Sequence, residues 1–248
     1  MSGHSKWNNI KRKKEKTDGA KAKIFTKVGR EIAVAVKMGG GDPNNNSTLK
    51  VLIAKAKANN IPNDNIERII KKAAGEGSKN SYENNTYEGY GPGGVAVIVE
   101  TLTDNNNRTA GDVRHLFDKF GGNMGTTGCV SFGFQEKGVF VIDNEEETYS
   151  EDQVMEDVMD AGADDFTMED GTIEITCEPS AFGGVLEALQ SKGYAFDTAE
   201  VQMVPNNYVT LTDPDQIKMM GLLLEKLEEN DDVQNVWHNW ERADEEEA

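Results

Sequence analysis

The chain has 248 residues, of which 37% are hydrophobic and 25 are glycine, a length and composition typical of a folded protein with two or three domains. No apolar run reaches the ~18 to 20 residues of a membrane span, and residues 1–14 lack the apolar segment of a secretory signal. We therefore expect a cytoplasmic protein with no membrane partner.

The net charge of −18 is divided unevenly along the chain. Residues 1–79 carry a net charge of +11, whereas residues 80–248 carry −29. Nucleic acid would repel the acidic part, but the basic part has the charge density that such a partner requires. The charge pattern predicts that nucleic acid binds to the first third of the chain.

The first third is predicted to form a basic tail followed by three helices. From residue 21 to 37, four apolar residues fall on one helical face and Lys23, Lys27, Arg30 and Lys37 fall on the opposite face. The glycines at 39–41 end this helix, and Gly29 inside it costs about 1 kcal/mol relative to alanine. A second helix is expected to start at Ser47 as its N-cap, and a third at Asn63 or Asp64. Their apolar stripes predict a small bundle.

The segment 75–94 is rich in Gly, Ser and Asn and is predicted to be a linker followed by a turn. After it, a strand at 95–102, a helix containing Val113 and Phe117, and a strand at 130–134 form a β-α-β unit. The segment NNNRT (105–109) leads from the strand into that helix, where Asn and Thr side chains suit the N-terminal cap, and Arg108 within it is a further candidate for a phosphate or partner contact.

A second series of elements begins at residue 139 and has the order β-α-β-β-α-β, which is the ferredoxin-like or split βαβ motif. Its strands are expected at 139–142, 165–168, 172–177 and 196–204, with helices at 151–161 and 180–192. A strand at 209–211, a helix at 217–227 and a strand at 233–237 then complete the earlier β-α-β unit. One ferredoxin-like domain would thus be inserted in another, although one larger mixed sheet is the alternative.

The predicted fold is therefore α+β, with an N-terminal three-helix domain and two ferredoxin-like domains, one inserted in the other. The predicted domains are 1–79 (basic and helical), 80–136 plus 206–240 (discontinuous α+β), 137–205 (inserted α+β) and 241–248 (acidic tail).

The basic tail combines clustered cations with one indole. Cations neutralise phosphates, and an indole stacks on exposed bases. The alternative is a solubilising tail whose Trp7 packs on its own helices. Together with the basic face of the first helix, the tail gives the predicted nucleic-acid-binding residues: His4, Lys6, Trp7, Lys11, Arg12, Lys13, Lys14, Lys16, Lys23, Lys27, Arg30 and Lys37.

Catalysis has little support in the sequence. The three histidines, His4, His115 and His238, are far apart, and the chain has no phosphate-binding loop, nucleophile motif or metal-binding motif. The two cysteines, Cys129 and Cys177, lack metal-ligand or disulfide spacing. We expect no enzyme activity, no cofactor and no metal, and keep an enzyme of undetected type as an alternative.

Several motifs together resemble the YebC/PmpR family: GHSKWNNIKRKK (3–14), FTKVGREI (25–32), GGGDPNNN (39–46), KAKANNIPNDNIERIIKKAAG (55–75), YEGYGPGGVAVIVETLTDNNNRT (87–109) and GCVSFGF (128–134). The resemblance implies an N-terminal helical domain and two α+β domains. It maps the family's basic motif onto His4, Lys6, Trp7, Lys11, Lys14, Lys27 and Arg30.

The resemblance implies a transcriptional regulator that binds DNA, because bacterial members are usually described in this way. Mitochondrial and some bacterial relatives are described as translation factors, so the alternative is a ribosome-associated factor that contacts ribosomal or transfer RNA. Phosphate contacts are common to DNA and RNA, and the charge pattern leaves both targets open. The acidic α+β domains would position the protein or bind protein partners from the transcription or translation machinery.

Overall fold

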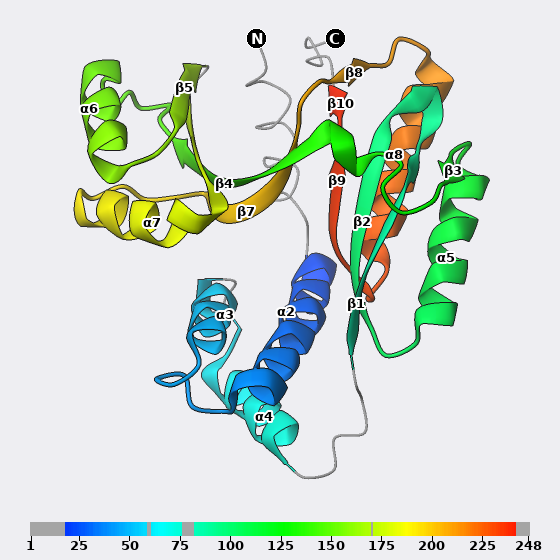
Figure 1. The fold of residues 1–248 in the computed structure, drawn as a ribbon, viewed down its shortest axis with the longest axis horizontal. Coiled ribbons are helices and arrows are strands. Elements are labelled where there is room, and N and C mark those ends of the chain that lie inside the picture. The colour runs from blue at the N-terminus through cyan, green and yellow to red at the C-terminus, as the bar shows by residue number, and fades with distance from the viewer. Residues whose placement is uncertain (1–17, 59–60, 76–81, 170, 242–248) are drawn as a thin grey trace. The chain divides into compact units, whose positions relative to one another are not determined.

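The computed structural model describes residues 18–58, 61–75, 82–169 and 171–241, with side chains from residue 24 onward except that of residue 58 (Figure 1). The described chain divides into two compact units. The first unit contains residues 18–130 and 212–236, and the second contains residues 131–211 and 237–241. The second unit thus interrupts the sequence of the first.

The first unit begins with the predicted bundle of three helices. These are α2 (Asp18–Gly39), α3 (Ser47–Ala58) and α4 (Asn63–Ala74). Their apolar stripes meet in one core, which includes Val28, Ile32, Leu49 and Ile66. Helix α2 ends at the predicted glycines, where Gly40 has a φ of 84° that favours glycine. The apolar periodicity correctly predicted this bundle.

The helix caps differ from the prediction. Asn46 caps α3 in place of Ser47, because its Oδ1 accepts a hydrogen bond from the backbone N–H of Leu49 at 3.0 Å. The Asn46 amide also donates to the carbonyl oxygens of Ala35 and Gly40, which explains why this polar side chain is buried. Pro62 precedes α4, and no side chain caps that helix.

A strand occupies part of the predicted linker. Strand β1 (Glu83–Tyr90) pairs antiparallel with β2 (Ala96–Thr103) through the turn η1 (Pro92–Gly94). The sequence of β1, ENNTYEGY, is mostly polar because much of it is exposed or half-buried, so it lacks the apolar pattern of a strand. The predicted turn is correct, and the predicted linker is wrong over residues 83–90.

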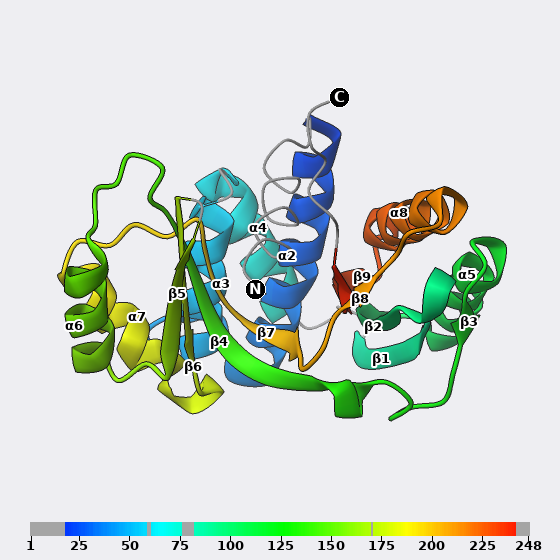
Figure 2. The same ribbon diagram turned by 90° about the horizontal axis from the view of Figure 1, so that it is seen from above.

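The sheet of the first unit has the strand order β3-β1-β2-β9. Its other elements are α5 (Asn106–Lys119), β3 (Asn123–Met124), α8 (Pro214–Glu229) and β9 (Val233–His238). Helices α5 and α8 lie on the same side of β1 and β2 (Figure 2). Gly89 and Gly91 permit this packing, because a Cβ at either position would lie within 3 Å of Phe117 or Met220, respectively. The predicted strand at 130–134 is instead the turn η2 (Ser131–Gly133) followed by the start of β4.

The second unit contains the predicted split βαβ motif. Its elements are β4 (Phe134–Asp143), α6 (Glu151–Ala161), β5 (Asp165–Glu169), β6 (Thr172–Cys177), η3 (Pro179–Ala181), α7 (Phe182–Ser191) and β7 (Thr198–Pro205). The strands pair antiparallel in the order β5-β6-β4-β7, and α6 and α7 lie on one side of the sheet (Figure 2). Two short strands that follow later in the chain, β8 (Val209–Thr210) and β10 (Trp240–Glu241), pair in parallel and form a separate two-stranded sheet.

The structure confirms the α+β class, with N-terminal helices followed by sheet domains. The finer division into domains that end at residues 79, 136, 205 and 240 stays a prediction.

Candidate nucleic-acid interface

The predicted nucleic-acid-binding residues are unequally represented in the structure. Eight of the twelve, from His4 to Lys16, lie outside the described residues. Lys23 lies in α2, but its side chain is also outside them. The structure therefore describes the surroundings of Lys27, Arg30 and Lys37.

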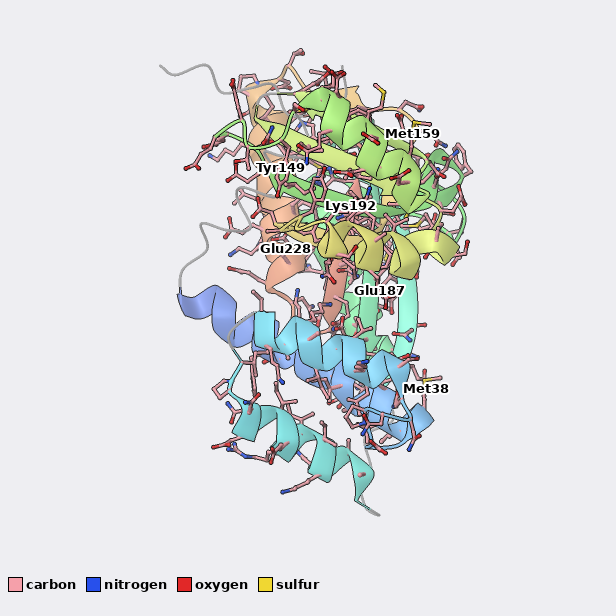
Figure 3. The ribbon with its side chains drawn as sticks, turned by 90° about the vertical axis from the view of Figure 1, so that its left-hand side faces the viewer. Met38, Tyr149, Met159, Glu187, Lys192 and Glu228 are labelled. Atoms are coloured by element: carbon pink, nitrogen blue, oxygen red, sulfur yellow. The ribbon has the colours of Figure 1, made fainter. Side chains whose placement is uncertain are left out.

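Lys27 and Arg30 make contacts within the first unit. Lys27 Nζ donates a hydrogen bond of 3.0 Å to the carbonyl oxygen of Glu228, in the last turn of α8. Glu228 is labelled in Figure 3. Arg30 Nη1 lies 2.7 Å from the carbonyl oxygen of Asp231 and 2.6 Å from Asp232 Oδ1. Lys27 thus faces the partly negative carboxyl end of α8, where positive charge is favourable, and Arg30 contacts the segment between α8 and β9.

Asp232 is the centre of a larger polar group, which we call the Asp232 cluster. Its members are Asp232, Arg30, Thr103, Arg108 and Thr109. Burial alone would raise the pKa of Asp232, but hydrogen bonds from Arg108, Thr109 and Arg30 outweigh that effect and lower the pKa to about 2. The carboxylate is therefore ionised at neutral pH although it is buried.

The structure confirms that an asparagine side chain caps the start of α5. Asn105 Oδ1 accepts a hydrogen bond from the backbone N–H of Arg108 at 3.1 Å and so caps the helix. The Arg108 guanidinium binds Asp232 and Asp104, and these hydrogen bonds raise its pKa. Sequence reasoning missed Asp232, for which the adjacent acidic residues at 231–232 were the available signal.

The remaining described cations of the bundle lie on the outer faces of the helices. Lys37, in the last turn of α2, is exposed. Arg68, Lys71 and Lys72 are exposed at i, i+3 and i+4 on α4, opposite the stripe that contains Ile66. Two more exposed lysines, Lys50 and Lys57, lie seven positions apart on α3. Their helical spacing was the sequence signal that could have identified these five residues.

These exposed cations can form phosphate contacts, since each is a hydrogen-bond donor with a positive charge. We call Lys50, Lys57, Arg68, Lys71 and Lys72 the α3–α4 cations. Lys55, between the two lysines of α3, differs because it pairs with Glu31 at 3.0 Å. Helical geometry therefore gives the bundle a basic outer surface on two helices.

Other kinds of site have less support in the described residues. Among them, no three His, Cys, Asp or Glu side chains come together as metal ligands, and no helix has the length and apolarity needed to cross a membrane. Cys177 is buried and Cys129 is half-buried, and burial raises the pKa of both thiols. This raises the fraction of unreactive thiol at neutral pH.

Two family models match nearly all of the chain. The model described as the TACO1/YebC protein N-terminal domain matches residues 5–76, and the model described as the TACO1/YebC second and third domain matches residues 82–240. A relative from Acetivibrio thermocellus, named "probable transcriptional regulatory protein", is 61% identical over 97% of this chain and 99% of its own length. A relative from Ruminiclostridium cellulolyticum with the same name is 58% identical over 100% of this chain and 99% of its own length.

The fold is also found in a solved structure. The crystal structure of a conserved hypothetical protein from Aquifex aeolicus superposes with a TM-score of 0.82 and 40% sequence identity, and the match covers 93% of this chain and 94% of that one. These similarities span both the helical bundle and the sheet domains. The chain therefore belongs to the TACO1/YebC family.

Proposed function

We propose that this protein is a non-enzymatic regulatory protein that binds DNA and controls transcription. The observation that carries the proposal is the separation of charge, with +11 in residues 1–79 and exposed cations on the outer faces of α3 and α4. Relatives with more than half of their residues identical are named as probable transcriptional regulators, which supports a regulatory role.

The alternative is a translation factor that contacts ribosomal or transfer RNA through the same bundle. Phosphates are common to both targets, so the same cations would serve. Crosslinking in cells followed by sequencing of the attached nucleic acid separates the two. Promoter DNA supports the first function, and ribosomal or transfer RNA supports the second.

The acidic inserted domain has a different role in this proposal. Residues 137–205 contain 18 acidic residues and two lysines. Lys137 pairs with Asp164 and Glu178. Lys192, which is labelled in Figure 3, pairs with Asp157 and Asp160. Because carboxylates surround both lysines, this domain repels phosphates. We assign it to contacts with protein partners of the transcription or translation machinery.

The contribution of the bundle can be measured directly. Alanine at Arg68, Lys71 and Lys72 should weaken binding to every duplex DNA sequence alike and flatten the slope of log K against log salt by about 2.7, from ~0.9 for each phosphate contact. A matched control replaces Arg114, Lys119 and Lys218, which are exposed on α5 and α8, and should leave the slope unchanged.

The predicted tail residues need a separate variant. Alanine at Lys11, Arg12, Lys13 and Lys14 should flatten the same slope by about 3.6 if all four contact phosphates. If neither the tail variant nor the α4 variant differs from the control variant, the bundle does not bind nucleic acid and the proposed function is wrong.

A further inference from the structure

Helix α2 is joined to the sheet of the first unit through one buried carboxylate. Asp232 directly precedes β9 and is 4% exposed. Its Oδ1 accepts a hydrogen bond of 2.6 Å from Arg30 on α2. Its Oδ2 lies 2.7 Å from both Arg108 Nη2 and Thr109 Oγ1 on α5. One side chain therefore binds two helices that are far apart in the sequence.

The contact of α2 with the sheet domain extends beyond Asp232. Arg30 Nη1 also donates to the carbonyl oxygen of Leu102, at the end of β2, at 3.1 Å, and its guanidinium lies 5.6 Å from the centre of the Tyr82 ring. One turn earlier on α2, Lys27 donates to the carbonyl oxygen of Glu228. Two cations that the charge pattern predicts to bind nucleic acid are thus engaged by oxygens of β2, α8 and the segment before β9.

These contacts conflict with a phosphate contact by the same side chains. Nη1 of Arg30 cannot donate to a phosphate while it faces three protein oxygens, and Asp232 would lose a charged partner if Arg30 left. By contrast, the α3–α4 cations point to solvent without such a conflict. Cations of the bundle therefore fall into an engaged pair and an exposed group.

We propose that Asp232 is a positioning residue, which fixes α2 on the sheet domain and keeps Lys27 and Arg30 from binding phosphates. In this state the bundle binds nucleic acid through the α3–α4 cations and the tail. Separation of α2 from Asp232 adds Lys27 and Arg30 to the binding surface. This role of Asp232 in nucleic-acid binding rests on the proposed function, because Asp232 would control how many cations of the bundle are available to phosphates.

The test compares full-length Asp232→Asn with Asp231→Asn. Asp231 is the matched control, because it is the neighbouring acidic residue and only its carbonyl oxygen contacts Arg30. In Asp232→Asn, the backbone amides of α2 should exchange hydrogen faster, while those of β1 and β2 keep their protection. Binding to a duplex DNA of random sequence should then become more salt-dependent, with a slope steeper by about 0.9 for each released cation and by up to about 1.8 for both.

A second variant removes the contact from the other side and covers the case in which Asp232→Asn does not fold. Arg30→Gln leaves Asp232 with Arg108 and Thr109, so the buried charge keeps partners. Release of Lys27 should steepen the salt slope of this variant by about 0.9. If Arg30 instead contacts a phosphate in the native protein, the slope should flatten by the same amount, and the proposal is overturned.

The remaining outcomes are also decisive. Unchanged exchange of the α2 amides in both variants would show that Asp232 does not hold α2. Faster exchange with an unchanged slope would show that Lys27 and Arg30 are not nucleic-acid ligands even when released. If the native protein binds neither duplex DNA nor single-stranded RNA, the proposed function fails, and the exchange measurement alone then decides whether Asp232 positions α2.

Discussion

Glu88 accepts a hydrogen bond of 2.9 Å from the backbone N–H of Val130, 42 positions later in the chain. Its other carboxylate oxygen accepts from the backbone N–H of Gly128 at 2.8 Å, and the residue is only 4% exposed. Charge-assisted bonds of this kind are stronger than those between neutral groups. Glu88 on β1 therefore holds the segment through which the chain leaves the first unit.

Replacement of Glu88 by glutamine tests this role. The amide keeps one acceptor oxygen but places an NH2 group where a backbone N–H needs an acceptor, so we expect a loss of about 1 to 3 kcal/mol in the free energy of unfolding. Urea denaturation measures it, and hydrogen exchange at Gly128 and Val130 should accelerate. The control is Glu67→Gln, an exposed change on α4, whose free energy of unfolding should stay within about 0.5 kcal/mol of that of the native protein. Equal losses of stability in the two variants would contradict the role of Glu88.

The lowered pKa of Asp232 predicts a stability change in acid. The pKa falls from the ordinary 3.8 to about 2 in the folded protein, so the carboxylate contributes about 2 kcal/mol above pH 4. That contribution is lost as the pH falls from about 4 through 2, because the unfolded chain takes up the proton first. About 1 kcal/mol should be gone at pH 3.

Urea denaturation of the native protein and Asp232→Asn between pH 6 and pH 3 measures this effect. The difference between their free energies of unfolding should be constant down to about pH 5 and then narrow, since other carboxyl groups titrate alike in both proteins. A difference of the same size at pH 6 and pH 3 would show that the carboxylate has no lowered pKa.

Asn46 offers a test of the loop between α2 and α3. Asn46→Ala removes the cap of α3 and the hydrogen bonds to Ala35 and Gly40, and should cost about 2 kcal/mol or more. Ser47→Ala, one position later, should change stability by less than about 0.5 kcal/mol, because Ser47 is exposed and Asn46 provides the cap. Thermal unfolding of both variants decides between the two residues, and a larger effect at Ser47 would contradict the assignment.

Gly29 lies where α2 approaches α4 closely. A Cβ at this position would meet Ile69 Cδ1 at 3.2 Å, a contact that the end of a flexible side chain can relieve. Gly29→Ala should therefore stabilise the protein by up to about 1 kcal/mol through helix propensity, whereas Gly29→Leu should destabilise it by about 1 to 3 kcal/mol through overpacking.

Gly111→Ala on α5 is the control for this pair, because nothing lies within 4 Å of a Cβ there. It should show the gain from helix propensity without the contact. Thermal unfolding measures the stability of both variants. If Gly29→Ala destabilises the protein while Gly111→Ala stabilises it, Ile69 cannot move and the α2–α4 spacing is fixed.

Local patterns predicted the elements whose residues alternate regularly between core and solvent. The apolar stripes that contain Ile66 on α4 and Leu223 on α8 correctly predicted helices. Apolar residues at alternate positions correctly predicted strand β6, in which these residues are buried. The sequence did not predict strand β1, because most of its polar residues are exposed or half-buried and its one glycine, Gly89, is required by packing against Phe117 of α5. Its neighbours in space, and not its own periodicity, make it a strand.

The polar sites could not be predicted in the same way. Thr103 and Arg108 are close to each other in sequence, but Arg30 lies 73 positions before Thr103 and Asp232 lies 129 positions after it. Periodicity reports only which face of an element is apolar, so it cannot show that a surface cation such as Arg30 meets a carboxylate. The charge pattern gave the sign of the bundle's charge, and the fold decided which cations remain exposed.

The 124 positions between Arg108 and Asp232 matter while the chain is being made. At about 5 to 20 residues per second, Arg108 is synthesised some 6 to 25 s before its partner. All four strands of the sheet β5-β6-β4-β7 leave the ribosome in that interval, whereas the sheet β3-β1-β2-β9 still lacks its last strand. The inserted sheet is thus complete first, and α2 can bind Asp232 only after all four strands of that sheet have been made.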